Sequence, residues 1–228
     1  YVRKSDDISP GSMSSSSPVN KIFYTYENVI TNITKLDALK NAAKEFVNSV
    51  YLDSPDSKIA IVSFADDATY NTGTSASNSL LNVRINSDTI NSNIISAING
   101  ISAIGSTHSN EGLKLANDIF QVNTDATRNR VVILFTDGEP GNYGFADNNG
   151  RRYAAAAINQ SAVLKGKRGS TVASDITFDG FKALDIEAPT TGNGPGKGAT
   201  VYTVGVFPST TNALIHKYMA WTSSDNKM

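Results

Sequence analysis

The sequence predicts an α/β protein whose doubly wound, mostly parallel sheet has helices on both faces and one antiparallel edge strand. Short apolar segments rich in β-branched residues lack strict alternation, which is typical of strands covered on both faces. Segments with apolar residues at helical spacing lie between them, and this order indicates a parallel sheet. The 228 residues suit one hydrophobic core, so we expect a single domain over residues 1–228, with a long insertion at about 141–198.

Three segments have the composition of buried parallel strands. They are Lys58-Ile-Ala-Ile-Val-Ser-Phe64, Arg130-Val-Val-Ile-Leu-Phe-Thr136 and Ala199-Thr-Val-Tyr-Thr-Val-Gly-Val-Phe207. Two further strands, Ala68–Tyr70 and Leu80–Ile85, lie on either side of a turn at Gly73. We expect these two to pair as an antiparallel hairpin at the edge of the sheet.

Five segments have apolar residues at the spacing of an amphipathic helix, so that each would turn one apolar stripe toward the sheet. They lie at residues 36–50, 90–101, 113–120, 153–164 and 214–221.

The composition excludes several classes of function. The formal net charge is −1 and no face is clearly basic, so we expect no nucleic-acid partner and no recruitment to an anionic membrane. The chain has no cysteine, which excludes zinc–thiolate sites, disulfides and thiol nucleophiles. No apolar run approaches the roughly 20 residues that span a bilayer, so we expect no direct membrane insertion.

The histidines do not indicate a catalytic metal. His108 and His216 lack the spacing of a zinc-protease motif. We expect His108 to be a solvated loop residue and His216 to be structural.

Three groups of oxygen-bearing residues support the functional hypothesis. They are Asp7-Ile-Ser-Pro-Gly-Ser12, Gly105-Ser-Thr107 ahead of the third helix, and Asp137 at the end of the strand 130–136. In an open parallel sheet, ligands bind beyond the carboxyl ends of the strands. Each group alone also has a structural explanation: a flexible serine-rich terminus, a helix N-cap at Thr107 and an Asx-turn at Asp137.

Together the three groups offer the ligands that a hard cation prefers. Mg²⁺ takes oxygen ligands in near-octahedral geometry and gives up its water reluctantly. Neutral hydroxyl groups can bind it directly, while carboxylates hold its waters and orient the hydroxyls. Because few protein charges would touch the ion, it could accept one more oxygen from an acidic residue of a partner. A metal site of this kind would also be a binding site.

At these residues the chain resembles the von Willebrand factor A domains, a Rossmann-like family. Their metal-ion-dependent adhesion site (MIDAS) reads Asp-x-Ser-x-Ser, then a Thr, then an Asp. The resemblance runs from about Thr34 to Gly141 and resumes at Ala199–Phe207 and at Lys217–Ser224. Its main segments are Leu36-Asp-Ala-Leu-Lys-Asn-Ala-Ala-Lys-Glu-Phe46, Lys58–Phe64, Gly105-Ser-Thr-His-Ser-Asn-Glu-Gly-Leu113 and Val131-Val-Ile-Leu-Phe-Thr-Asp-Gly-Glu-Pro140. The sequence is most similar in character to adhesive domains of Gram-positive surface and pilus-tip proteins.

The resemblance implies magnesium as the ion, with manganese or calcium as alternatives. It implies metal roles for Asp7, Ser9, Ser12, Thr107 and Asp137.

This sequence departs from the family pattern in two places. The family usually reads Asp-x-Ser-Gly-Ser-Met, whereas Pro10 is inserted here, so Gly11 stands at the strict spacing and Ser12 one place late. We prefer Ser12, brought to the ion by a bulged loop. The family also has a central apolar strand before the first Asp, for which Tyr1–Asp6 is too short and too polar. That strand lies upstream, or comes from another segment such as Ile22–Ile30, or this region is misread.

The leading hypothesis is a metal-dependent adhesion or protein-binding module, and not an enzyme. We expect it to be extracellular, on a Gram-positive cell wall or pilus. Its partner would be a protein, such as a host matrix protein or a pilus or surface subunit. The alternative is a scaffold domain with a degenerate, metal-free site, which Pro10 and the missing first strand favour. A metal-dependent hydrolase ranks last, because no general base is evident.

Overall fold

A computed structural model of the chain describes residues 2–4, 25–27, 33–86, 89–123, 125, 127–136, 139–166, 177–183, 198–205 and 213–224. The chain divides into two compact units, Tyr1–Thr34 and Lys35–Met228. In the first unit, β1 (Val2–Lys4) pairs antiparallel with β2 (Thr25–Glu27). That residues 1–228 form a single domain therefore stays a prediction. The second unit is described below by itself.

Each of the five segments with helical periodicity forms a helix, as predicted. Two of these helices begin at a polar cap that satisfies an unpaired backbone donor. Asn91 accepts a hydrogen bond from the Asn93 amide at 3.1 Å, and Asp147 accepts one from the Asn149 amide at 3.2 Å. The helices are α1 (Lys35–Asp53), α2 (Ser92–Asn99), α3 (Ser109–Val122), α4 (Asn148–Leu164) and α5 (Ala213–Thr222).

The parallel orientation predicted for the apolar strands is confirmed for two of them. β9 (Val131–Thr136) and β12 (Thr200–Gly205) run side by side over six residue pairs, from Val131 opposite Thr200 to Thr136 opposite Gly205. Between them in sequence lie a short 3₁₀ turn, η1 (Gly144–Ala146), helix α4 and the hairpin β10 (Thr177–Phe178) with β11 (Phe181–Lys182).

The predicted hairpin between Ala68–Tyr70 and Leu80–Ile85 is wrong in its pairing. β5 (Ala68–Tyr70) pairs antiparallel with β4 (Val62–Phe64), and β6 (Leu81–Asn82) pairs antiparallel with β3 (Lys58–Ile59). Both therefore lie along one edge of the segment 58–64. The loop between them is tied to that segment by Thr72, whose hydroxyl accepts from the Ile61 amide at 3.0 Å and donates to the Ser79 carbonyl at 2.7 Å. The remaining residues of the predicted strand enter a second hairpin, β7 (Arg84–Asn86) with β8 (Thr89–Ile90).

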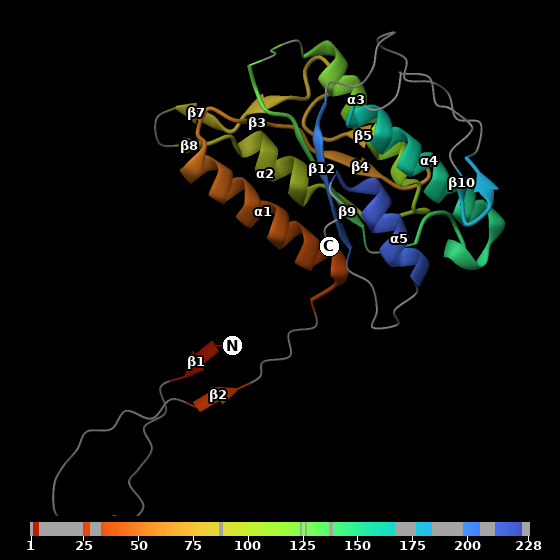
Figure 1. Ribbon diagram of the computed structural model, residues 1–228. Coiled ribbons are helices and arrows are strands. Elements are labelled where there is room, and N and C mark those ends of the chain that lie inside the picture. Colours follow the sequence, from red (N-terminus) through yellow and green to blue (C-terminus); the bar gives the residue numbers. More distant parts are fainter. Residues whose placement is uncertain are drawn as a thin grey trace, which may run out of the picture. The chain divides into compact units, whose positions relative to one another are not determined.

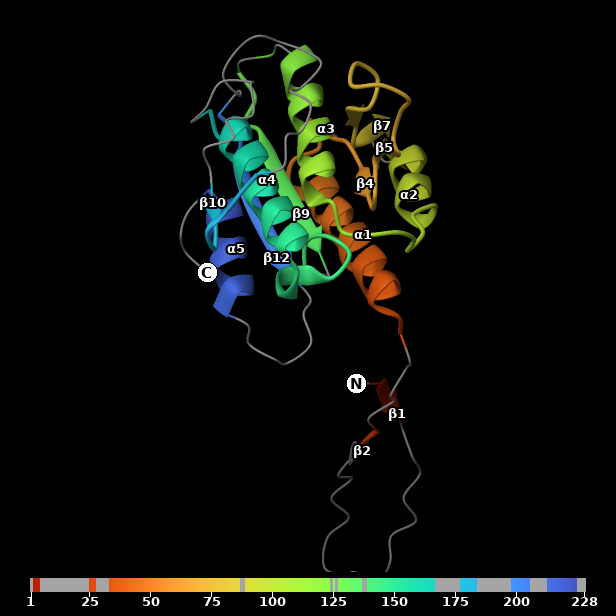
Figure 2. The same cartoon turned by 90° about the vertical axis from the view of Figure 1, so that its right-hand side faces the viewer.

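Helices lie on both sides of the parallel pair. Helices α3, α4 and α5 are on one side of β9 and β12, and α1 is on the other (Figures 1 and 2). The larger core lies on the first side, where Ala154–Ala157 of α4 are fully buried beside Leu134 and Val201 of the strands. A second cluster of Val47, Val83, Ile94 and Ile98 joins α1 and α2, with Ile59 and Ile61 packed against it. No helix in the described ranges is long and apolar enough to cross a bilayer.

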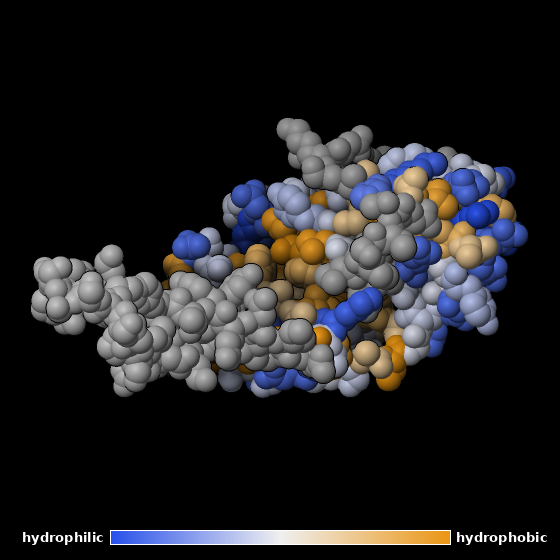
Figure 3. All heavy atoms as spheres, turned by 90° about the horizontal axis from the view of Figure 1, so that it is seen from below, coloured by the Kyte–Doolittle hydropathy of each residue, from blue (hydrophilic) through white to orange (hydrophobic). Residues whose placement is uncertain are grey.

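Apolar surface also remains outside these cores. Val131, Tyr202 and Val204 of the parallel pair are 49%, 54% and 40% exposed, although they belong to strands at the centre of the unit. In the space-filling view, apolar side chains gather in the middle of the face seen from below (Figure 3).

Tyr218 of α5 brings a polar group into the larger core. Its side chain is 1% exposed, and its hydroxyl lies 2.5 Å from the Ser109 Oγ of α3. Phe178 packs edge-on against its ring at a centroid distance of 6.4 Å. Burial raises the pKa of Tyr218 to about 12, although the hydrogen bond with Ser109 acts in the opposite direction.

The alkaline stability of the fold tests this burial. Because the pKa of Tyr218 is higher in the folded state than its ordinary value of 10.0, its contribution is fully present below pH 10 and is lost as the pH rises toward 12. Two pKa units correspond to roughly 3 kcal/mol. We expect Tyr218→Phe to reduce the fall in the free energy of unfolding between pH 9 and pH 12, measured by urea denaturation. Tyr143→Phe, at a residue 78% exposed, is the control and should leave this decrease in the free energy of unfolding unchanged. The same decrease in both variants would contradict this account.

Candidate functional site

The predicted metal ligands are only partly within the described residues. Thr107 is described, whereas Asp7, Ser9, Ser12 and Asp137 lie outside the described residues. Asp137 directly follows Thr136, the buried last residue of β9. Within the described ranges, no three or more His, Cys, Asp or Glu side chains are grouped so that they could hold a metal ion.

Thr107 is not the N-cap of α3, which its sequence position alone suggested. The N-cap is His108, and its side chain makes no capping hydrogen bond. The Thr107 hydroxyl forms no hydrogen bond to any other residue that the structure describes. The structural explanation for this threonine therefore fails, and its hydroxyl is available to a ligand.

The backbone of Thr107 joins the loops at the carboxyl ends of two strands. The Gly141 amide donates to the Thr107 carbonyl at 3.0 Å, and the two residues form an isolated antiparallel bridge. The next amide, that of His108, donates to the carbonyl of Ala65 at 2.9 Å, just after β4. The Thr107 loop is thus bonded both to the end of β4 and to the loop that follows β9, in which Asp137 stands.

Asp66 holds the turn that leads into Thr107. Its Oδ1 accepts a hydrogen bond from the Ser106 amide at 3.2 Å. Gly105 has a φ of +76°, and a Cβ there would lie 2.6 Å from Asp66 Oδ2. Only glycine fits this approach without strain. The Asp66 side chain is exposed but still fixes this loop.

His108 is not the solvated loop residue that the sequence indicated. Its ring stacks on Tyr153 of α4 at a centroid distance of 3.9 Å and an angle of 12°. Its Nδ1 lies 2.8 Å from the Asp66 carbonyl, which can only accept, so Nδ1 carries the proton. Burial raises the pKa of the Tyr153 phenol, and the negative charges of Glu111 and Asp66 raise it further. The stack fixes α4 beside the Thr107 loop, and no local sequence pattern predicted it.

The loop after β9 is folded tightly onto the start of α4. Glu139 Oε2 accepts a hydrogen bond from the Phe145 amide at 2.7 Å. A Cβ at Gly150 would lie 1.9 Å from the Gly144 carbonyl oxygen, so only glycine permits this packing. Thr136 and the segment from Glu139 onward are therefore held by the tertiary structure.

The donors present at this end of the strands fit a hard divalent cation. The Thr107 hydroxyl has no described partner, and the neighbouring Ser106 Oγ is buried without one among the described residues. Hydroxyl oxygens of this kind suit a hard cation such as magnesium better than softer metals.

A comparison with known protein families finds a match to one domain family. The model of the von Willebrand factor type A domain matches residues 11–139, more than half of the 228-residue chain. The matched region includes Ser12, Thr107 and Asp137. It begins after Asp7 and Ser9, so it lends these two residues no support.

Comparison with solved structures gives the same fold. The chain is similar to the crystal structure of the vWF domain of the type V pili tip protein Mfa5 from Porphyromonas gingivalis, with a TM-score of 0.50 and 15% sequence identity. The similarity covers 86% of this chain and 81% of that one. No curated protein sequence matches the chain.

The role assigned to Asp66 is testable by amide exchange. Asp66→Ala removes the acceptor of the Ser106 amide, so we expect that amide to exchange about fivefold faster, the effect of losing roughly 1 kcal/mol of hydrogen bonding. Asp67→Ala is the matched control, because the Asp67 carboxylate is also exposed but makes no hydrogen bond to a described residue. Equal exchange in the two variants, measured by NMR, would show that Asp66 does not hold the turn.

Proposed function

Because the chain belongs to the von Willebrand factor type A domain family, we propose that it is a protein-binding module that grips an acidic residue of its partner through a divalent cation. The proposed ion is magnesium, with manganese or calcium as alternatives. We propose no catalytic activity for the chain.

The observation that carries the proposal is the bridge between Thr107 and Gly141. It brings a hydroxyl with no described partner to the loop that follows β9. That loop contains Asp137 at the end of a parallel strand, where open α/β sheets bind their ligands.

Each proposed ligand has a separate task. The hydroxyls of Thr107 and Ser12 would bind the cation directly, and the Asp137 carboxylate would balance its charge. Asp66 positions the turn that carries Thr107, and the His108–Tyr153 stack holds that turn against α4. The cation, when bound, would supply a Lewis acid that accepts a carboxylate oxygen from the partner.

The N-terminal ligands depart most from the family pattern. Asp7 and Ser9 precede the region matched by the family model, and Pro10 interrupts the family spacing. These facts support the alternative, a scaffold domain whose degenerate site holds no metal. We retain Asp7 and Ser9 as proposed ligands, to be tested separately from Thr107 and Asp137.

The proposed location is the cell surface, with a protein partner such as a pilus or surface subunit or a host matrix protein. The similarity to a domain described as part of a pilus tip protein supports this location. The Gram-positive source expected from the sequence remains a prediction.

Metal titration distinguishes the two candidate functions. We expect the full chain to bind Mg²⁺ in isothermal calorimetry, Thr107→Ala and Asp137→Ala to lose measurable binding, and Thr107→Ser to retain it because the hydroxyl is kept. No heat at millimolar Mg²⁺ in the unaltered chain would reject the metal-dependent function in favour of the scaffold.

The contribution of the N-terminal ligands is measured in the same way. If Asp7 and Ser9 bind the ion, Asp7→Asn and Ser9→Ala should each weaken Mg²⁺ binding by about tenfold or more, the usual cost of losing a direct or supporting ligand. Asp67→Ala is the control for a general change in acidity. Unchanged affinity in both variants would restrict the site to Ser12, Thr107 and Asp137.

A further inference from the structure

A small cavity lies between helix α3 and the loop that follows β5, and we call it the α3 pocket. Its volume is about 340 Å³. Its lining residues are Tyr70, Thr74, Ser75, Ala76, Ser77, Asp118 and Val122. They belong to the ranges 33–86 and 89–123, which the structure describes without a gap. Both walls of the pocket are therefore formed by described segments.

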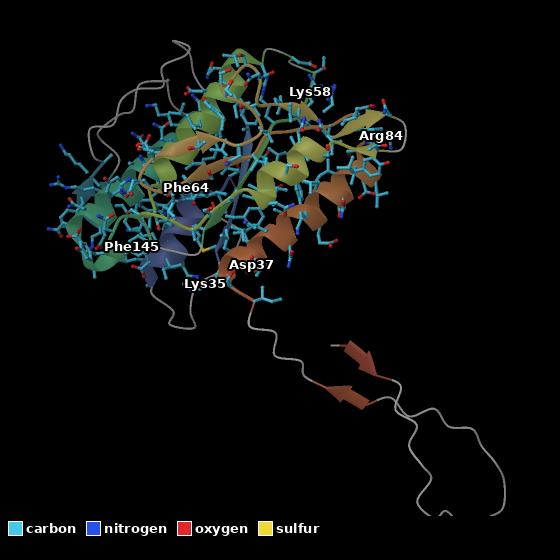
Figure 4. The ribbon with its side chains drawn as sticks, turned by 180° about the vertical axis from the view of Figure 1, so that it is seen from behind. Lys35, Asp37, Lys58, Phe64, Arg84 and Phe145 are labelled. Carbon is cyan, nitrogen blue, oxygen red and sulfur yellow. The ribbon has the colours of Figure 1, made fainter. Side chains whose placement is uncertain are left out.

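The α3 pocket is far along α3 from the proposed cation site. Lys58 and Phe64 mark the two ends of segment 58–64 (Figure 4), and the Thr107 loop is bonded just beyond Phe64. Strand β5 is antiparallel to β4, so Tyr70 at its end lies back toward Lys58. Helix α3 begins directly after the Thr107 loop and ends at Val122. The proposed cation site and the α3 pocket are thus at opposite ends of this helix.

Gly112 allows α3 to lie close against the strands. A Cβ on Gly112 would be 2.7 Å from the Phe64 Cδ1 of β4, so a larger residue would push the helix away. Asp118 and Val122 lie further along the same helix. Because they are four residues apart, they share one face of α3 and form adjoining parts of the pocket wall.

Asp118 brings a carboxylate to the pocket. The residue is only 3% exposed, and a buried charge is costly unless polar groups surround it. Asp118 also interacts with another residue of the chain, but a carboxylate has about four acceptor positions and can still accept from a ligand. Burial raises the pKa of the Tyr70 phenol, and the negative charge of Asp118 raises it further. The carboxylate and the phenol are therefore close enough to bind the same small molecule.

The loop that forms the other wall is held in its shape by its own hydrogen bonds. Asn78 Oδ1 accepts from the amides of Thr74 and Ser75 at 2.9 and 3.0 Å. Ser79 Oγ donates to the Ser75 carbonyl at 2.6 Å. A Cβ at Gly73 would lie 2.5 Å from Asn78 Oδ1, so this packing needs glycine. A wall that is ordered in advance reduces the entropy that a ligand must overcome.

The hydroxyl groups of the pocket can donate to a ligand. The Tyr70 hydroxyl forms no hydrogen bond to any other residue that the structure describes. Thr74 Oγ1 accepts from Asn78 Nδ2 at 3.0 Å, and this bond does not use the threonine's own proton. Ser75 Oγ and Ser77 Oγ are 3.1 Å apart, and only one of the two can donate to the other. The pocket therefore offers several donors beside the Asp118 acceptor.

This set of groups selects the class of ligand. Asp118 would repel an anion. An ammonium group has donors only, so it would leave the hydroxyl donors of the pocket unused. A neutral molecule with neighbouring hydroxyls can donate to the carboxylate and also accept from the hydroxyls. The Tyr70 ring and Val122, which is 39% exposed, offer apolar surface for the C–H face of a ring. The volume is at the lower end of the range of about 300–1,000 Å³ for ligand pockets, which suits a single ring.

We propose that the α3 pocket binds a neutral monosaccharide. The Asp118 carboxylate accepts from the hydroxyls of the sugar, while Tyr70 and the loop hydroxyls donate to its oxygens. The Tyr70 ring and Val122 cover its apolar face. This binding does not depend on the proposed metal-dependent function, because none of the described lining residues belongs to the Thr107 loop.

NMR titration of the full chain in EDTA tests the proposal. Glucose, galactose, mannose and N-acetylglucosamine are added separately, each to tens of millimolar. We expect at least one of them to bind with a dissociation constant in the millimolar range, as suits a single ring held by a few hydrogen bonds. It should shift the amide signals of Ser75, Ser77 and Asp118 and leave those of Thr107 and His108 unchanged.

Two variants locate the sugar. Asp118→Asn keeps the shape of the side chain but removes its charge, so we expect about tenfold weaker binding or more, because hydrogen bonds to a charged group are the stronger ones. Tyr70→Phe keeps the ring and removes the hydroxyl, and should weaken binding about fivefold. Asp53→Asn, at the exposed end of α1, is the matched control and should leave the affinity unchanged. The melting temperature checks the fold, and Tyr70→Phe decides the result if Asp118→Asn does not fold.

Three results would overturn the proposal. One is the absence of shifts at the pocket amides with all four sugars. Another is equal sugar affinity in the unaltered chain and in the folded pocket variants, which would place the sugar elsewhere. The third is sugar binding that appears only when Mg²⁺ replaces EDTA, which would assign the sugar to the metal site.

Discussion

The candidate site depends on one short stretch of backbone, the Thr107–His108 segment, which bonds to two otherwise separate strand ends. The carbonyl of Thr107 holds the loop after β9, and the amide of His108 holds the end of β4. Parallel strands bring their carboxyl ends to one edge of a sheet, but they do not by themselves fix the loops there. These two hydrogen bonds supply that constraint, and the Asp66 carboxylate and the Tyr153 ring reinforce it.

The arrangement of strands also shapes the surroundings of the proposed site. At the carboxyl end, the Thr107 loop presents a hydroxyl with no described partner, which suits a hard cation. Along the strands, the edges of β9 and of segment 58–64 face each other across an apolar cavity. Gly105, Ser106 and Thr107 line the end of this cavity.

The sequence located most helices and strands correctly, but it did not predict all the contacts between them. Periodicity located the helices, and the apolar segments at 130–136 and near 200 were correctly predicted to be parallel strands. The pattern of Ala68–Tyr70 identified a strand but not its neighbour, because side-chain alternation is the same whichever strand supplies the hydrogen bonds. Thr107 was a candidate N-cap from the sequence, since a hydroxyl residue just ahead of a helix usually caps it. The cap position falls on His108 instead, and the stack of His108 on Tyr153 joins residues from separate elements.

The sequence by itself determined the α/β class, the helix positions and the absence of thiol chemistry. These properties follow from local periodicity and composition, which every short segment carries on its own. Only the tertiary structure decided that Thr107 has no capping role, that Asp66 fixes its turn, and that two strands line an apolar cavity. Each of these depends on hydrogen bonds and packing between segments distant along the chain, and their geometry exists only once the elements have packed together.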